Sequence, residues 1–315
     1  MHKIVLSPMA GVTDAPFRHI ARQYGADITI SEMLTAQTHL WASNKSQIRL
    51  QDNWAATDAH KIMQIAGGTP DVIADAAIQC QLHGAKAIEI NMGCPAKKVC
   101  NVLAGSALLK DEKLVANILK AAVRATSLPI MLKTRLGWDE TQQNILTIAK
   151  IAEDTGISSL TIHGRNRADL YNGEARYELI AKAREQLSIP VFANGDLTTP
   201  QKVKQVLDYT RANGAYIGRA ALGQPWLFKQ IKEYLAIGCY STISAENKYT
   251  TILEHLKLIH QHYGENMGYR IARKHLKWYW QNLSLNMLDL IKLNEIESCQ
   301  IQYAAVKSLL EGSLK

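Results

Sequence analysis

The stretch "PVFANGDLTTPQKVKQVLDYTRANGAYIGRA", residues 190–220, contains one complete copy of the unit from which most of the chain is built. A short apolar run ends in Asn-Gly-Asp, Pro200 opens a segment with helical spacing, and a second apolar run ends in Gly-Arg. A strand, a helix and a second strand in this order predict a parallel βαβ unit.

The same unit recurs on the N-terminal side of this stretch. We expect eight strands, each ending in glycine or polar residues, at 4–11, 27–33, 61–67, 87–94, 129–138, 158–165, 190–196 and 215–220. Eight such units in ~235 residues predict an α/β fold of the (β/α)8 TIM-barrel type. The alternative is an open doubly wound sheet. That fold usually carries a glycine-rich fingerprint after its first strand, and "SPMAGVTD" (7–14) lacks one.

The strand signal stops near residue 238. Residues 239–315 predict helices at about 244–263, 268–282, 285–292 and 295–311. We therefore expect two domains, a barrel at 1–238 and a small all-helical C-terminal domain at 239–315.

Composition narrows the class of protein. No run approaches the ~20 apolar residues of a membrane span, and the first residues lack a signal-peptide pattern, so we expect no membrane contact. The five cysteines are odd in number and scattered, which favours reduced thiols in the cytoplasm and predicts no metal site. A net charge of +8 indicates a polyanionic partner if the positive charges cluster.

Polar side chains gather where the expected strands end. In a TIM barrel these carboxyl ends meet at one face, where active sites lie. The residues at this edge are Gln64, Asn91, Cys94, Lys133, Arg135, His163, Asn194, Asp196 and Arg219. Packing alone does not explain polar residues confined to one edge of eight apolar strands, so we expect the active site there.

The last two strand ends predict a phosphate site. Gly195 and Gly218 let the backbone approach a phosphate closely, and Arg219 adds positive charge. The loops at these positions of a TIM barrel commonly bind phosphate. The alternative is a pair of ordinary turns.

Three further side chains leave several chemistries open. A positive charge such as Lys133 near the pyrimidine edge of a flavin stabilises the reduced, anionic flavin. Lys133 is also compatible with a Schiff base, and His163 with a core histidine. Cys94, fixed by Pro95 at a strand end, is compatible with a buried core residue, a metal ligand, a nucleophile or an acid.

A series of motifs, in order along the chain, resembles the tRNA-dihydrouridine synthases. The motifs are "SPMAGVTDAPFR" (7–18), "SEM" (31–33), "MQIAG" (63–67), "INMGCPAKKV" (90–99), "GSALL" (105–109), "LKTRLGW" (132–138), "TIHGR" (161–165), "FANGD" (192–196) and "IGRAALGQPW" (217–226). The resemblance covers essentially the whole chain. It is nearest to the bacterial B-type, on "NMGCPAKKV", "YNGEARY" and "GYRIARKH".

The resemblance implies a barrel that binds FMN and a helical domain that binds tRNA. NADPH would reduce the FMN, and the 5,6-double bond of a uridine in the D-loop of tRNA would then be reduced to dihydrouridine. The flavin contacts that the resemblance implies are Pro8, Met9, Ala10, Gln64, Lys133, His163, Asn194, Gly195, Asp196, Gly218 and Arg219.

The resemblance also assigns the general acid to Cys94. Hydride delivered to C6 of uracil leaves C5 in need of a proton, which a thiol can supply. Because this thiol must start protonated, we expect its pKa near or above the ordinary ~8.5. Asn91 would hold the uracil edge, and Lys97 and Lys98 would meet substrate phosphates.

The segment "GYRIARKHLKWYW" (268–280) predicts a basic helical face. Its cations fall within an arc of about 100° and are Arg270, Arg273, Lys274 and Lys277. No acidic residue occurs between Glu265 and Asp289. We expect this face to contact RNA, with a solvated helix face as the alternative. Arg165 and Arg167 are further candidates for RNA contact.

Cys100 departs from the family pattern, because many relatives have asparagine there. The change would weaken a loop hydrogen bond or leave a second thiol near the site. Two other functions stay open. An FMN barrel acting on a small pyrimidine or enone leaves the basic helix unexplained, and a non-catalytic RNA-binding protein on the same fold leaves Cys94 and Lys133 unexplained. We expect a monomer.

Overall fold

The computed structural model describes residues 2–50 and 61–313 of the chain. Its strands are β1 Lys3–Leu6, β2 Ile28–Thr29, β3 Leu34–Thr35, β4 Ile62–Ala66, β5 Ala87–Met92, β6 Ile130–Arg135, β7 Ser159–His163, β8 Val191–Asn194 and β9 Gly214–Ile217. Its α-helices are α1 Ala15–Gln23, α2 Asn44–Leu50, α3 Pro70–Leu82, α4 Lys97–Cys100, α5 Glu112–Ala125, α6 Ile145–Asp154, α7 Glu178–Gln186, α8 Pro200–Thr210, α9 Leu227–Ile237, α10 Ala245–Asn282, α11 Met287–Glu295 and α12 Cys299–Gly312.

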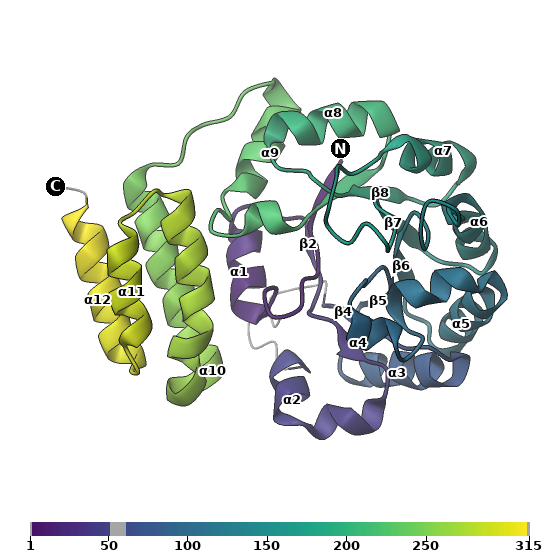
Figure 1. Ribbon diagram of the computed structural model, residues 1–315, viewed down its shortest axis with the longest axis horizontal. Coiled ribbons are helices and arrows are strands. Elements are labelled where there is room, and N and C mark those ends of the chain that lie inside the picture. Colours follow the sequence, from purple (N-terminus) through teal and green to yellow (C-terminus); the bar gives the residue numbers. More distant parts are fainter. Residues whose placement is uncertain (1, 51–60, 314–315) are drawn as a thin grey trace.

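The strands form one parallel sheet that curls into a barrel surrounded by helices (Figure 1). The strand order is β2-β1-β9-β8-β7-β6-β5-β4-β3. A bridge between Ile30 and Ile62, with a hydrogen bond of 3.0 Å from the Ser31 amide to the Ile62 carbonyl, joins the end of β2 to β4. The expected barrel is confirmed.

The eight expected strands correspond to β1, β2 and β4 to β9, and β3 is an addition. This strand pairs Leu34 with Ile65 and Thr35 with Ala66 at the end of β4. It lies directly after the expected strand at 27–33 and is not separated from it by any turn signal in the sequence.

Side chains cap the helices that follow β1 and β8, and α8 begins at Pro200 as expected. The Asp14 side chain accepts the Phe17 amide at 3.0 Å and caps α1. Thr199 caps α8 in the same way, accepting the Lys202 amide at 3.1 Å. These caps satisfy backbone donors that the first turn of a helix leaves unpaired. They set the points at which the chain leaves the carboxyl ends of β1 and β8.

Alternation along the strands separates two apolar layers. In β5, Ile88 and Ile90 pack in the core between the sheet and the helices. The other face points into the barrel, where Ala87 belongs to a small core cluster. That cluster consists of Val5, Ile30, Ile62, Ala87, Met131, Phe192 and Tyr216. Polar side chains follow it toward the carboxyl ends of the strands.

The C-terminal helices form a second bundle beside α1 (Figure 1). Within α10, Gly264 has a φ of 69° and a ψ of 177° and breaks the helix into two arms. These arms correspond to the expected helices at 244–263 and 268–282, and α11 and α12 to the other two. The bundle has its own core, with Leu276, Trp280 and Val306 among its members.

The two parts share a segment that precedes α9. Trp226 is buried in the core of the helical bundle, although it lies before the expected boundary at residue 238. A Cβ on Gly223 would lie 2.2 Å from the Trp278 carbonyl oxygen, so α10 presses directly on this backbone. Asn282 Nδ2 donates to the Leu222 carbonyl at 2.9 Å. The division into domains at residue 238 stays a prediction. Residues 1, 51–60 and 314–315 of the two predicted domains lie outside the described residues.

Among the described helices, none combines the length and apolar character needed to cross a membrane.

Candidate active site

Cys94 lies in a loop that Asn91 organises from the end of β5. The Asn91 Oδ1 accepts the amides of Gly93 at 3.0 Å and Cys94 at 2.9 Å. The Cys94 carbonyl in turn accepts the Ser106 hydroxyl at 2.8 Å. A Cβ on Gly105 would lie 2.8 Å from the same carbonyl oxygen, so the returning chain needs glycine there. The thiol therefore sits in a loop closed on both sides.

The environment of Cys94 keeps its thiol protonated. Burial raises the pKa of the Cys94 thiol above its ordinary value, and this effect outweighs the hydrogen bond from the Ala96 amide. The side chain is half-buried. A protonated thiol is the form that a general acid requires, whereas a nucleophile would need a lowered pKa.

Cys100 lies beside Cys94 in the same loop. Its Sγ is 3.6 Å from both the Cys94 carbonyl oxygen and the Ser106 Oγ, and the side chain is buried. The structure thus places the second thiol next to the Cys94 backbone. The Cys100 thiol contacts the same Cys94 carbonyl oxygen that accepts the Ser106 hydroxyl.

A hydrogen-bonded chain crosses the barrel interior below this loop. Asn91 Nδ2 donates to Gln64 Oε1 at 3.1 Å, and Gln64 Nε2 donates to Glu89 Oε1 at 2.7 Å. The Tyr216 hydroxyl, from β9, donates to Glu89 Oε2 at 3.0 Å. Because each donor has an acceptor, these polar groups can be buried at little cost.

Lys133 lies on β6, in register with Asn91. Its Nζ donates to Asn194 Oδ1 at 2.9 Å, and Asn194 Nδ2 donates to the Tyr216 carbonyl at 2.8 Å. Burial lowers the pKa of Lys133 to about 8, and the charge of Glu89 opposes that effect. The ammonium group is thus held in a fixed direction.

His163 ends β7 between Lys133 and the β8 strand. Burial, together with the neighbouring cations, holds the pKa of His163 far below its ordinary value, so the imidazole is neutral. Its ring packs against Gly195, where an added Cβ would lie 2.9 Å from His163 Cδ2. Gly195 also has a φ of 115°, which disfavours any side chain.

The expected phosphate residues lie together at the ends of β8 and β9. Asp196 is 3.6 Å from Arg219, whose side chain is 58% exposed. Arg219 also lies over the Tyr171 ring at 4.8 Å. A Cβ on Gly218 would meet atoms only at 3.7 Å or more, so space is available beside this backbone. A phosphate at this position could contact the exposed guanidinium of Arg219 and the backbones of Gly195 and Gly218.

Arg165, one of the residues expected to contact RNA, is buried and paired with Asp196. Its side chain is 2% exposed and forms two hydrogen bonds with Asp196, at 2.9 Å and 2.7 Å. Arg165 also donates to the carbonyls of Asn172 and Gly173. It therefore holds Asp196 and the loop after β7 in place, because a buried and fully engaged guanidinium cannot reach a phosphate in solution.

The loop after β1 carries Pro8, Met9 and Ala10 at the barrel mouth. The Met9 amide donates to Thr13 Oγ1 at 3.0 Å, and the Gly11 amide donates to Glu32 Oε1 at 2.5 Å. Lys274 of α10 donates to the Gly11 carbonyl. The helical bundle thus touches the loop that is expected to contact flavin.

The remaining RNA candidates differ in exposure. Lys97, Lys98, Arg270 and Lys277 are exposed. Arg167 is half-buried, with its guanidinium 4.3 Å from the centre of the Trp138 ring. Arg273 and Lys274 are also half-buried, because Arg273 donates to the Ile296 carbonyl at 3.1 Å and Lys274 to Gly11. The expected basic face is therefore split between exposed and half-buried side chains.

A buried group lies where the bundle meets α1. One possible ligand atom from each of Asp14, His255 and His275 falls within 4.8 Å of the others. The pKa of His255 is lowered to about 3, mainly by burial, and the charge of Lys274 lowers it further. Asp14 already accepts hydrogen bonds from the Phe17 amide and the Tyr263 hydroxyl. This environment suits a polar contact between the two parts better than a dication, and the absence of metal stays a prediction.

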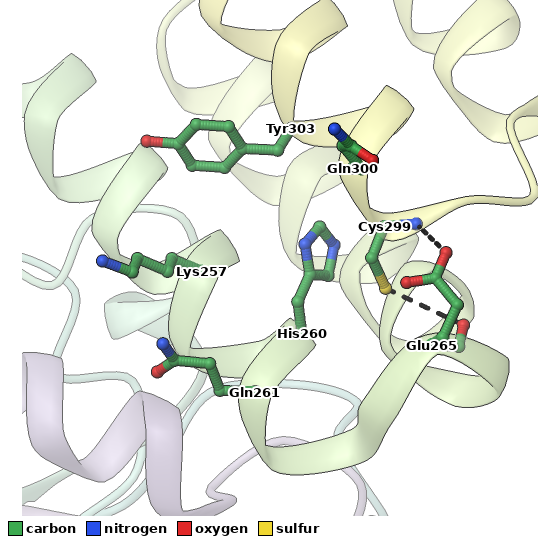
Figure 2. A pocket seen from close by; sticks show the side chains of 7 residues that line it. All are labelled: Lys257, His260, Gln261, Glu265, Cys299, Gln300 and Tyr303. Atoms are coloured by element: carbon green, nitrogen blue, oxygen red, sulfur yellow. Dashed lines mark hydrogen bonds between the residues drawn. The ribbon is translucent and has the colours of Figure 1, made fainter.

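A shallow pocket of about 470 Å³ lies in the helical bundle (Figure 2). Its lining comes from the bend of α10 and from the start of α12. These residues are Lys257, His260, Gln261, Glu265, Cys299, Gln300 and Tyr303. Glu265 accepts the Cys299 amide at 2.8 Å and so ties the two helices together. None of the residues predicted for the active site lines this pocket.

Sequence reasoning missed one buried residue that shapes the site, Glu89, and assigned no role to another, Arg135. Glu89 lies inside the barrel, and its position between Ile88 and Ile90 in an alternating strand was the available signal. Arg135 was noticed only as a polar strand end. It donates to the carbonyls of Gly93, Asn166 and Leu170 at 2.8 Å each and links the loops after β5 and β7.

The barrel carries a protonated thiol, a buried lysine and a neutral histidine at the carboxyl ends of β5, β6 and β7. These residues lie on one face of the barrel, as the active-site residues of α/β-barrel enzymes do. The family model described as dihydrouridine synthase matches residues 5–307. The chain belongs to the dihydrouridine synthase family.

Curated relatives match along nearly the whole chain. The tRNA-dihydrouridine synthase B of Pseudomonas aeruginosa is 48% identical over 307 residues, covering 97% of this chain and 92% of the relative. The enzyme of the same name from Vibrio vulnificus is 43% identical over 312 residues, covering 99% and 96%. Among solved structures, 6-hydroxypseudooxynicotine amine oxidase from Pseudomonas geniculata N1 matches with a TM-score of 0.54 and 14% identity. That match covers 79% of this chain and 50% of the other and supports the fold alone.

Proposed function

We propose that this protein reduces the 5,6-double bond of uridine in tRNA to dihydrouridine, with FMN as cofactor and NADPH as reductant. Membership of the dihydrouridine synthase family and the names of the full-length relatives support the reaction and the substrate. The observation that carries the proposal is the position of Cys94. A protonated thiol stands at the carboxyl end of β5, one strand away from Lys133.

The residues at the barrel mouth fit FMN. The backbones of Gly195 and Gly218, with the exposed Arg219, would hold the phosphate. Lys133 would face the pyrimidine edge of the ring system, where the reduced cofactor gains negative charge. The other contacts would come from Gln64, His163, Asn194, Asp196 and the loop residues Pro8, Met9 and Ala10. FMN reduced by NADPH supplies hydride equivalents to C6 of uracil.

Cys94 would complete the reaction as the general acid. Addition of hydride at C6 places negative charge toward C5 and O4, and the Cys94 thiol donates its proton to C5. The resulting thiolate is reprotonated from solvent. The net reaction consumes NADPH, one proton and uridine, and it gives NADP⁺ and dihydrouridine. Asn91 Nδ2 has a second hydrogen beyond the one it donates to Gln64, and this hydrogen would bind the uracil edge.

The exposed cations would bind the tRNA backbone. Lys97 and Lys98 on α4 stand beside the Cys94 loop, and Arg270 and Lys277 lie on the second arm of α10. Phosphate contacts of this kind orient an RNA without reading its sequence. The proposed tRNA substrate and the free cysteines support a cytoplasmic location, and the monomeric state stays a prediction.

The proposal is tested by assaying the purified protein on two substrates. After reconstitution with FMN, it should absorb visible light as a flavoprotein, and NADPH should bleach that absorption. Unmodified tRNA should then gain dihydrouridine, whereas free uridine should not react measurably. A protein that reduces free uridine as well as tRNA would be a small-pyrimidine reductase, and one that binds tRNA but no flavin would be a non-catalytic RNA-binding protein.

A further inference from the structure

Glu89 is a carboxylate placed where strands normally put apolar side chains. Its exposure is 0%, and it lies on the face of β5 that points into the barrel. Ala87, two residues earlier on the same face, packs in the apolar interior cluster. Charged residues are rarely buried unless another group compensates them. The surroundings of Glu89 therefore identify what the carboxylate does.

Both oxygens of Glu89 are fixed by neutral donors. Gln64 Nε2 donates to Oε1 at 2.7 Å, and the Tyr216 hydroxyl donates to Oε2 at 3.0 Å. Hydrogen bonds donated to both oxygens stabilise the carboxylate rather than the protonated acid. Burial acts in the other direction and raises the pKa of Glu89 to about 7. Lys133 is the main charge that opposes this rise.

Lys133 has the complementary surroundings. Its side chain is 9% exposed, and Asn194 Oδ1 accepts one of its three protons. Of the charges that act on it, Glu89 favours the ammonium form most strongly and Arg135 disfavours it. The protonated Cys94 thiol and the neutral His163 imidazole carry no charge beside it. Asn91, two residues beyond Glu89 on the same face of β5, is paired with Lys133 on β6, so both side chains point into the barrel from neighbouring strands. Glu89 is thus the main compensating charge of Lys133.

We propose that Glu89 is a positioning residue that keeps Lys133 in its ammonium form and thereby sets the reduction potential of a flavin bound at the barrel mouth. The inference rests on the FMN cofactor proposed above. Glu89 does not contact the flavin in this account and acts through Lys133 alone. A fixed positive charge beside the pyrimidine edge stabilises the reduced anion and raises the potential. Without the negative charge of Glu89, Lys133 would lose its proton, and with it this positive charge, at a lower pH.

The test is the pH dependence of the potential in Glu89→Gln. Glutamine keeps the size of the side chain and can still accept one hydrogen bond, but it carries no charge. In the native holoenzyme, the potential should change slope at the pH where Lys133 loses its proton, which burial places below the ordinary pKa of a lysine. In the variant, this change of slope should move to lower pH by about one unit, the scale on which loss of a nearby opposite charge shifts a pKa.

A second variant assigns the change of slope to the lysine. Lys133→Met should abolish it, and adding Glu89→Gln to Lys133→Met should then alter nothing further in the pH profile. Tyr216→Phe removes one donor to the carboxylate and keeps its charge, so it should move the change of slope in the same direction by less. If Glu89→Gln does not fold, this milder variant decides the question.

The outcomes separate the two proposals. If no variant and no native protein binds flavin, the cofactor proposal fails. If flavin binds and the change of slope stays at the native pH in Glu89→Gln and Tyr216→Phe, Glu89 does not act on Lys133 and the inference is overturned. A change of slope that moves in the Lys133→Met background also overturns it, because Glu89 would then act directly on the flavin.

Discussion

The side-chain oxygen of Asn91 accepts the backbone amide of Cys94 at 2.9 Å, so the last polar residue of β5 aims the thiol that follows it. The same oxygen holds the Gly93 amide at 3.0 Å. One asparagine therefore fixes the turn in which the proposed acid stands.

Two replacements of Asn91 separate the turn from substrate binding. Asn91→Asp keeps an acceptor for both amides but loses the Nδ2 donor, whereas Asn91→Ala loses both. If Nδ2 binds uracil, kcat/KM on tRNA should fall about tenfold or more in both variants, the scale of one lost hydrogen bond. Full activity in Asn91→Asp would limit Asn91 to organising the loop. Flavin reduction by NADPH serves as the control and should stay at the native rate.

Replacing Cys94 should stop the second half of the reaction only. Cys94→Ala should bind flavin and accept electrons from NADPH, but dihydrouridine formation should fall by roughly 10²-fold or more, the scale of general acid catalysis. Cys100→Ala is the matched control, because this thiol lies in the same loop and should be dispensable. Rapid single-turnover reduction of tRNA by the pre-reduced enzyme gives the measurement. Loss of activity in Cys100→Ala with activity retained in Cys94→Ala would reverse the assignment.

Arg165→Gln should affect the folded barrel rather than RNA binding. The change leaves Asp196, which is partly exposed, without its buried partner and should lower the free energy of unfolding by about 2 kcal/mol, less than for a fully buried pair. Flavin affinity should fall with it. Binding of tRNA measured over a range of salt concentrations should keep its native slope. A flatter slope would return Arg165 to the RNA surface.

The exposed half of the basic face should carry the salt dependence of tRNA binding. Arg270→Gln with Lys277→Gln should flatten the slope of log affinity against log salt by about 1.4, at ~0.7 for each phosphate contact. Lys274→Gln should change that slope little. It should instead weaken flavin binding, because Lys274 holds the Gly11 carbonyl beside the loop of Pro8, Met9 and Ala10. An unchanged slope in the double variant would move the RNA surface to Lys97 and Lys98.

Asp14 should make the protein less stable as pH rises through weakly acidic values. Burial raises the pKa of Asp14 from 3.8 to about 6, so the folded state holds this proton more tightly than the unfolded state does. The group therefore favours folding below about pH 4, and that contribution is lost as pH rises to about 6. Asp14→Asn removes this dependence and can still cap α1. Relative to the native protein, its stability should rise between those pH values by up to about 3 kcal/mol, at 1.36 kcal/mol per pKa unit.

Asp139→Asn is the control for this measurement. The hydrogen bond from Thr141 lowers the pKa of the exposed Asp139 carboxyl, so its removal should act in the opposite direction over acidic pH. Thermal melting of the three proteins at several pH values decides the sign. Equal pH dependence in Asp14→Asn and native protein would contradict the role given to burial.

The sequence predicts the barrel well, because period-two strands, helix caps and glycines are local signals. The helix α8 begins at Pro200, where the local pattern placed it. The order of the strands then brings Cys94, Lys133 and His163 to one face without further information. Contacts that depend only on the order of the strands could therefore be predicted from the sequence.

The rest depends on contacts between distant segments. Arg165 comes directly after a strand, a position from which an arginine can contact RNA. It is buried because it binds Asp196, thirty-one residues later in the sequence. Lys274 has the spacing of a surface cation, but the barrel approaches that side of α10. Asp14 and His255 meet for the same reason. A helical wheel shows which residues share a face and does not show what covers it.

The segment from Leu222 to Trp226 decides how this architecture can be cut and recombined. Trp226 belongs to the helical core, and the Gly223 backbone lies against Trp278. A chimaera joined at residue 238 would therefore pack the helical bundle of one parent against the Leu222–Trp226 segment of the other. A chimaera that exchanges RNA specificity between relatives needs its junction before Leu222. It also needs the residues around Gly11 and Asp14 from the same parent as the bundle.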